Sequence, residues 1–123
     1  MWTVDSSWLY AFFDAADAHH GAARAEASAP GAWLVNPVAL VETLDLVRHR
    51  TGRATSVRFY ETLLGMGQVH LVGAPKPAVM ARLMAQHGGI SWQDASVLAT
   101  ALDEGADLRT FDKDQRKAFE ALR

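Results

Sequence analysis

Four acidic residues stand at positions that solubility alone does not explain. Asp5 ends a β-prone apolar run, Glu42 lies within an apolar helical segment, Asp94 begins the apolar stripe of a later helix, and Asp112 follows the last strand-like run. Carboxylates that converge repel one another unless a cation neutralises them. The pattern therefore predicts a metal site assembled from distant parts of the chain.

The chemistry expected of such a site is metal-assisted hydrolysis. Carboxylate oxygens suit Mg²⁺ or Mn²⁺, which keep several waters and leave positions open for a phosphodiester. One ion lowers the pKa of a bound water for attack, and the same or a second ion stabilises the leaving oxygen. A nuclease of this kind needs no serine, histidine or cysteine nucleophile.

Asp5 and Glu42 each have a structural alternative. Asp5 is a candidate turn or cap residue, although Ser6 and Ser7 offer the cap for the next helix themselves. Glu42 lies on a helix that is apolar nearly all round, which predicts a buried helix and a costly unpaired charge. The alternative for Glu42 is a solvated edge of that helix, beside Asp45.

Asp94 fits a helix-capping pattern as well as a metal site. The segment Ser91-Trp92-Gln93-Asp94 matches the capping box, in which a serine and an acid three residues later bond to each other's backbone. Helical spacing also places Asp94 at the head of the apolar stripe that continues through Val97, Leu98 and Ala101. Both roles are compatible only if the carboxylate oxygens are shared.

Asp112 has a close neighbour of the same type. In the segment Thr110-Phe111-Asp112-Lys113-Asp114, one aspartate is expected to cap the terminal helix. We assign that cap to Asp114, which leaves Asp112 for the site. Asp114 remains close enough in sequence to substitute for it.

Strand-like and helical segments alternate along the chain. Apolar runs predict strands at residues 2–4, 69–72 and 107–110. Periodicity, capping residues and Gly or Pro breaks predict helices at residues 8–13, 18–27, 37–50, 54–64, 76–87, 91–104 and 114–122. This alternation predicts a single α/β domain over residues 1–123, with a mainly parallel sheet of about four strands flanked by helices. Ligands of such sheets gather at the carboxyl ends of strands, where Asp5 and Asp112 fall.

Composition narrows the functional classes. The chain has 123 residues, half of them hydrophobic, with no cysteine and a net charge of -2. The absence of cysteine excludes disulfides and thiolate metal sites and favours a cytoplasmic location. No apolar run has membrane-spanning length and no secretion signal is evident, so we expect no membrane association. The charge argues against a protein that coats nucleic acid through bulk basicity.

At these residues the chain resembles the PIN domain family, and more narrowly the VapC-type ribonuclease toxins. The resemblance covers nearly the whole length, and the order and spacing of its pieces carry it. The pieces are Val4-Asp5-Ser6-Ser7, Glu42 in a central apolar helix, Ile90-Ser91-Trp92-Gln93-Asp94-Ala95, Ala99-Thr100-Ala101 and Leu108-Arg109-Thr110-Phe111-Asp112.

The resemblance implies a function and a set of roles. It implies metal ligation by Asp5, Glu42, Asp94 and Asp112, supported by the polar side chains of Ser6 and Thr110. It also implies an Mg²⁺- or Mn²⁺-dependent endoribonuclease that acts as the toxin of a type II toxin-antitoxin pair. Its partners would be RNA, a protein antitoxin and a second copy of the chain in a homodimer.

Other readings of the same acids remain. An aspartate-based phosphatase needs a second aspartate two residues after the first, where this chain has Ser7, and a receiver domain needs an acidic pair and a late lysine. A housekeeping nuclease of the same fold without an antitoxin is one alternative. A PIN-like interaction module without catalysis is the other, and retention of all four acids speaks against it.

Overall fold

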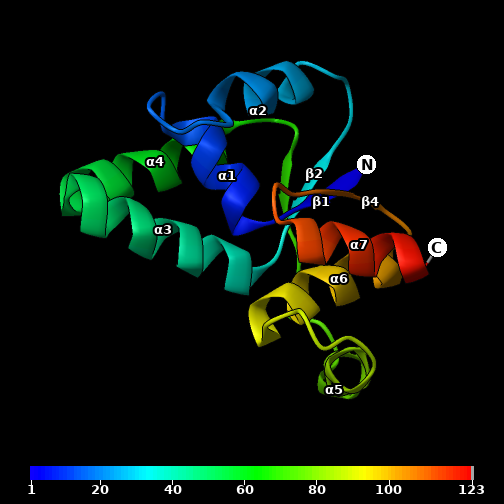
Figure 1. Ribbon diagram of the computed structural model, residues 1–123. Helices are drawn as coiled ribbons and strands as arrows, with labels where there is room; N and C mark the ends of the chain where they lie inside the picture. Colours follow the sequence, from blue (N-terminus) through cyan, green and yellow to red (C-terminus); the bar gives the residue numbers. More distant parts are fainter. Residues whose placement is uncertain (123) are drawn as a thin grey trace.

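Four short strands form a parallel sheet at the centre of the computed structural model, which describes residues 1–122 (Figure 1). The strands are β1 (Trp2–Val4), β2 (Trp33–Val35), β3 (Val69–Leu71) and β4 (Asp107–Arg109). Their order across the sheet is β3-β2-β1-β4, and every neighbouring pair is parallel. The predicted α/β class and its parallel sheet are confirmed.

The strand β2 was not located by the sequence pattern. Trp33, Leu34 and Val35 are all buried, and the strand pairs with β1 on one side and β3 on the other. Its three residues are all apolar, so they show none of the alternation that distinguishes a strand. Pairing on both sides, which only the assembled sheet supplies, makes this segment a strand.

Seven helices flank the sheet within residues 1–122. They are α1 (Ser6–Phe13), α2 (His20–Ala27), α3 (Pro37–Thr51), α4 (Arg53–Gly65), α5 (Pro77–Gln86), α6 (Trp92–Glu104) and α7 (Lys113–Leu122). In Figure 1 the first four helices lie on one side of the strands, and α5, α6 and α7 lie on the other. Each predicted helix is present, with its ends shifted by at most two residues. No helix within residues 1–122 combines the length and apolar character needed to cross a membrane.

A separate hydrophobic core fills each side of the sheet. On the side of α1 to α4, Trp8 packs edge-on against Trp33 with ring centroids 4.8 Å apart, and neither indole is exposed. On the other side, Leu98 of α6, Leu108 of β4 and Phe119 of α7 belong to one buried cluster. Side chains alternate along a strand, and Trp2 and Val4 of β1 accordingly share the first core, while Leu108 of β4 belongs to the second.

Only one face of α3 is buried, which corrects the expectation for this helix. Asn36 caps it by accepting a hydrogen bond from the backbone of Ala39 at 2.8 Å, as the Asn-Pro start signal predicts. Thr43 and Val47 face the interior, but 58% of Val41 is exposed. The prediction that this helix is buried all round was therefore wrong. The helix carries more apolar residues than its one buried face can pack into the core, and the remaining ones are exposed.

The strand order creates a switch point between β1 and β4. The chain passes from β1 to β2 to β3 in one direction across the sheet and then places β4 on the opposite side of β1. The crossovers before and after this change of direction cover different faces of the sheet (Figure 1). Connections therefore diverge from the carboxyl ends of β1 and β4, where ligands of open α/β sheets bind.

Candidate functional site

Asp5 follows β1 at this switch point and also caps α1. Its Oδ1 accepts hydrogen bonds from the backbone N–H of Trp8 at 2.9 Å and from the hydroxyl of Ser7 at 2.7 Å. The cap was expected from Ser6 or Ser7, so that prediction was wrong. The helix begins at Ser6, one residue earlier than a serine cap allows, and Asp5 thereby occupies the N-cap position.

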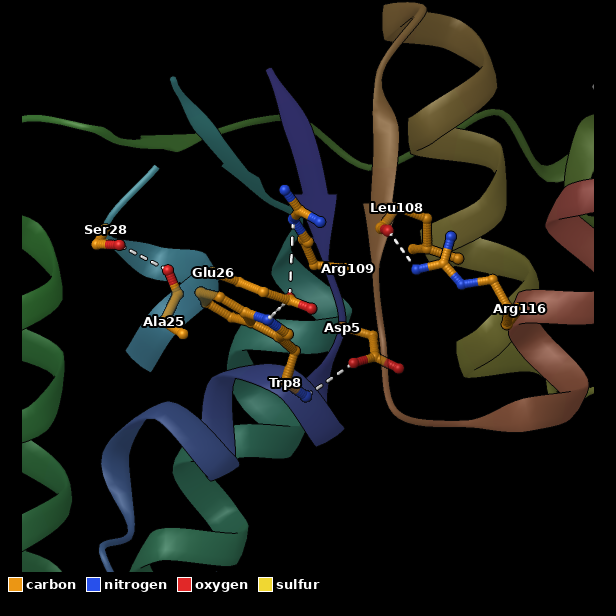
Figure 2. A network of polar contacts seen from close by, with 8 residues as sticks. All are labelled: Asp5, Trp8, Ala25, Glu26, Ser28, Leu108, Arg109 and Arg116. Atoms are coloured by element: carbon orange, nitrogen blue, oxygen red, sulfur yellow. Dashed lines mark hydrogen bonds and ion pairs between the residues drawn. The ribbon is translucent and has the colours of Figure 1, made fainter. Parts of the chain in front are cut away.

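The second oxygen of Asp5 faces the turn after β4. Figure 2 shows the carboxyl group between the start of α1 and this turn. Oδ2 accepts a hydrogen bond from the hydroxyl of Thr110, and the backbone N–H of Asp5 donates to the carbonyl of Arg109 at 3.2 Å. The two segments, separated by more than a hundred residues, thus meet at one carboxylate.

Burial raises the pKa of Asp5. Only 5% of the residue is exposed, and loss of hydration penalises its charged form. Hydrogen bonds from Thr110, Ser7 and the Trp8 backbone lower the pKa in part, whereas the nearby charge of Asp94 raises it. Asp5 is therefore a desolvated anion with another anion close by.

The neighbouring cations are engaged elsewhere. The guanidinium of Arg109 lies over the ring of Trp2, 4.6 Å from the ring centroid. Arg109 also pairs with Glu26 at 3.8 Å, and Arg116 donates to the carbonyl of Leu108 at 2.6 Å (Figure 2). Within residues 1–122 no lysine, arginine or histidine forms an ion pair with Asp5 or Asp94. Hydrogen bonds, but no ion pair with the described residues, thus offset the charge of these two acids.

Glu42 reaches the site from α3. The residue is half-buried, and its Oε1 accepts a hydrogen bond from the hydroxyl of Ser6, next to Asp5 in the chain. This contact joins α3 to the first turn of α1, so Glu42 is held toward the carboxyl end of β1 rather than turned into solvent. Neighbouring Asp45 behaves differently, because it is exposed and pairs with Arg48 at 3.6 Å.

Asp94 closes the predicted capping box. Its Oδ2 accepts the backbone N–H of Ser91 at 3.0 Å, while its own N–H donates to the Ser91 hydroxyl at 3.1 Å. The side chain is half-buried, and its Oδ1 has no hydrogen bond from residues 1–122. Capping therefore uses one oxygen and leaves the other available, as a shared role requires.

Asp112, rather than Asp114, caps the terminal helix. Its Oδ1 accepts the backbone N–H of Gln115 at 2.9 Å, and its own N–H donates to the Thr110 hydroxyl at 3.0 Å. The assignment of the cap to Asp114 was wrong because α7 begins one residue earlier than predicted. Asp114 lies in the exposed first turn, against Gly89 of the loop before α6. Asp112 keeps its Oδ2 free of hydrogen bonds from the described residues.

The sequence interpretation missed two polar residues beside these acids. Ser7 links Asp5 to the backbone N–H of Phe111, which donates to its hydroxyl at 3.1 Å. Gln115 is fully buried and bonds to both Thr110 and Asp94. A usable signal was present for Gln115, because it shares helical spacing with the buried Ala118 and Phe119 and so interrupts an apolar face.

Three helices direct their amino ends toward the acids. Asp5 caps α1, Asp94 closes the capping box of α6 and Asp112 caps α7. The amino end of a helix carries partial positive charge, which stabilises an ionised carboxylate. This arrangement keeps three anions at one edge of the sheet without a cationic side chain.

The residues fit a hard divalent cation by their chemistry. All the candidate donors are carboxylate oxygens, and Asp94 and Asp112 each retain one oxygen without a hydrogen bond from residues 1–122. The same part of the chain has no three acidic or histidine side chains already grouped at ligating positions. Hydrogen bonds through Ser6 and Thr110 connect Glu42 and Asp112 to the surroundings of Asp5, and the charge of Asp94 acts on Asp5 directly.

Comparison with known proteins identifies the class. The PIN domain family matches residues 3–120, and the chain belongs to this family. No curated protein matches the sequence at a significant level.

Two solved structures resemble the chain along most of its length. One is VapC20 of Mycobacterium tuberculosis, described as a Sarcin-Ricin loop cleaving toxin, with a TM-score of 0.81, 26% identity, and 96% of this chain and 95% of that chain covered. The other is PAE2754 of Pyrobaculum aerophilum, with a TM-score of 0.68 and 20% identity. That match covers 98% of this chain and 85% of the other chain. The second likeness concerns the fold alone. The predicted resemblance to the PIN domain and VapC-type proteins is confirmed.

Proposed function

We propose that the chain is an Mg²⁺- or Mn²⁺-dependent endoribonuclease that hydrolyses RNA phosphodiester bonds. Asp5, Glu42, Asp94 and Asp112 are the proposed metal-binding residues. The observation that carries the proposal is the buried carboxylate of Asp5 at the switch point, with the charge of Asp94 beside it. Likeness to a ribonucleic-acid-cleaving toxin over almost the whole chain supports the same activity.

The protein residues have separable tasks in this proposal. Ser7 orients the Asp5 carboxylate and Ser6 orients that of Glu42, while Thr110 holds Asp5 in the metal-free protein. The amino ends of α1, α6 and α7 place partial positive charge beside Asp5, Asp94 and Asp112. When bound, the divalent cation supplies charge for the phosphodiester oxygens and activates water as the nucleophile. We propose that Asp112, rather than Asp114, completes the set.

We further propose that the nuclease is the toxin of a type II toxin-antitoxin pair and acts in the cytoplasm as a homodimer. The whole-length likeness to the Mycobacterium tuberculosis toxin supports this assignment. A short reading frame for an antitoxin beside the gene is the expected genomic context. A solitary gene would instead favour the housekeeping nuclease, and light scattering of the purified protein tests the dimer.

Cleavage assays test the activity itself. Purified protein should cleave a panel of RNAs, including a sarcin-ricin hairpin, with Mg²⁺ or Mn²⁺ and should stop when EDTA is added. Asp5→Asn and Asp94→Asn should each lower the rate by more than about 100-fold, since even residues that only support metal ligands cost about 10- to 100-fold. Asp103→Asn, an exposed change on the same helix as Asp94, is the matched control.

Two outcomes would reject the proposal. Variants at Asp5 and Asp94 that cut as fast as the Asp103→Asn control would show that the acids are not the site. A folded parent protein that cleaves no RNA with either ion, yet carries all four acids, would favour the interaction module.

A further inference from the structure

Gln115 is a buried polar residue whose hydrogen bonds reach the surroundings of three acids. It lies in the first turn of α7 and none of its surface is exposed. Its Nε2 donates to the backbone carbonyl of Asp94 at 3.3 Å, and its backbone N–H donates to Asp112 Oδ1 at 2.9 Å. Its Oε1 accepts from the hydroxyl of Thr110 at 3.0 Å, and Thr110 in turn contacts Asp5.

The partners fix the orientation of the Gln115 amide. A backbone carbonyl accepts hydrogen bonds and never donates them, so the NH₂ group must face Asp94. The oxygen of the amide therefore faces Thr110. Because buried polar groups are costly without partners, an amide with both ends bonded is held firmly in this orientation.

The hydroxyl of Thr110 has one proton and two acceptors within 3.0 Å, while the Ser7 hydroxyl is farther away at 3.5 Å and donates its own proton to Asp5. Its oxygen already receives the backbone N–H of Asp112, so the proton points either to Asp5 Oδ2 or to Gln115 Oε1. Donation to Asp5 uses one lone pair of Oδ2 and draws electron density from it, which weakens this oxygen as a ligand for a cation. Donation to Gln115 leaves that oxygen free and still satisfies the hydroxyl.

We propose that Gln115 is a positioning residue that accepts the Thr110 proton when Asp5 Oδ2 binds a divalent cation. This inference rests on the proposed function. The hydroxyl turns from one acceptor to the other, no covalent bond changes, and Asp5 is released without leaving a buried group unpaired. If Gln115 had only a structural role, it would join α7 to α6 through Asp94. Its effect on Mn²⁺ affinity would then not depend on the Thr110 hydroxyl.

Mn²⁺ affinity, measured by titration calorimetry without RNA, separates the two roles. The effect of Thr110→Val on affinity is compared in three backgrounds, namely the parent, Gln115→Glu and Gln115→Met. Glutamate keeps an acceptor for the Thr110 proton, whereas methionine has a similar length and lacks one. The affinity with and without Thr110→Val is compared within each background. The added charge of the glutamate is present in both proteins of its pair, so it does not contribute to the difference between them.

The expected result is a coupling between the two positions. The effect of Thr110→Val should be the same in the parent and in Gln115→Glu, within the scatter of about 2-fold expected for independent changes. In Gln115→Met the change in Mn²⁺ affinity caused by Thr110→Val should differ from that in the parent by about 10-fold. This is the lower end of the range of effects seen for residues that support a metal ligand. The same effect in all three backgrounds would overturn the proposal.

Controls address folding and the site itself. Gln115→Leu provides a second apolar background if the methionine variant does not fold, and the exposed Gln93→Met should leave the affinity unchanged. Melting of each metal-free variant reports its structural cost separately. If the parent binds Mn²⁺ no better than Asp5→Asn, the proposed metal site fails and takes this inference with it. If the parent binds Mn²⁺ and no coupling appears, the inference alone fails.

Discussion

The hydroxyl of Ser6 donates a hydrogen bond to Oε1 of Glu42, across 36 residues of sequence. Ser6 is the first residue of α1 and directly follows Asp5, so the contact ties the glutamate of one helix to the strand end that carries the aspartate. One hydroxyl thereby fixes the relative position of two carboxylates that neither helix could set alone. The consequences of this relationship can be measured.

Removal of the Ser6 hydroxyl should impair the site without unfolding the protein. Ser6→Ala leaves Glu42 free to change rotamer, and we expect about a 10-fold loss of cleavage rate and of Mn²⁺ affinity. Ser6→Thr, which keeps a hydroxyl, should retain more of both. Full activity in Ser6→Ala, measured at limiting Mn²⁺, would contradict this account of the contact.

Glu42 and Asp45 provide a matched pair on one helix. Glu42→Gln removes the charge that faces the site and should lower cleavage by more than about 100-fold, because a ligand contributes more than the residues that support it. Asp45→Asn removes an exposed charge and should leave the rate unchanged. It should cost less than about 1 kcal/mol of stability through its pair with Arg48. Equal effects of the two changes on cleavage would exclude Glu42 from the site.

Asp5→Asn should stabilise the metal-free protein at neutral pH. Asparagine caps a helix about as well as aspartate does, so the bond from the Trp8 backbone survives while the desolvated charge is removed. Asp94→Asn should likewise stabilise by relieving repulsion. Denaturant unfolding in EDTA measures both, and a marked loss of stability would indicate that hydrogen bonding to the charge outweighs its burial.

The advantage of Asp5→Asn should depend on pH in a defined direction. Burial raises the pKa of Asp5, so the folded state binds this proton more tightly than the unfolded state does. The resulting stability is fully present below the ordinary aspartate pKa of 3.8 and is lost as the pH rises through the higher folded pKa. The stability difference between Asp5→Asn and the parent should therefore shrink as the pH falls from 7 toward 4. A difference that stays constant over this range would show that the Asp5 charge is not its source.

Saturating Mn²⁺ should reverse the order of these stabilities. A ligand that binds only the folded state at 100 times its dissociation constant stabilises it by about 2.7 kcal/mol. The parent should gain this stability and Asp5→Asn should not. Thermal melts with and without Mn²⁺ check the reversal, and an equal gain in both proteins would place the ion elsewhere.

Substitutions at Asp112 and Asp114 should separate capping from catalysis. Asp112→Asn keeps an N-cap acceptor for the Gln115 backbone and should remain stable, yet lose about 10-fold or more in cleavage. Asp112→Ala should lose about 1 kcal/mol of stability in addition. Asp114→Asn should alter neither property appreciably. Loss of cleavage in Asp114→Asn with full activity in Asp112→Asn would assign the fourth position to Asp114.

The starts, caps and positions of several helices were predictable from residues close together in the sequence. The Asn36-Pro37 start of α3 and the Ser91 to Asp94 capping box are present as predicted, because each depends on residues at most four apart in the chain. Helix positions followed from periodicity for the same reason. The four candidate acids were also recognisable in sequence, since each combines an ionisable group with apolar neighbours.

Features that depend on partners far away in the sequence could not be predicted from local patterns. The strand β2 exists because β1 and β3 pair with it, and α3 buries one face because the core accommodates no more. Whether Asp5 or a serine caps α1, and whether Asp112 or Asp114 caps α7, depends on where each helix begins, and that follows from how strands and turns position the chain. The alternative acceptors of Thr110 arise from segments that meet at the edge of β1 and β4. Short-range patterns were enough to mark the candidate acids and most helices, whereas long-range packing sets the caps of α1 and α7, the strand β2 and the buried hydrogen bonds of Gln115.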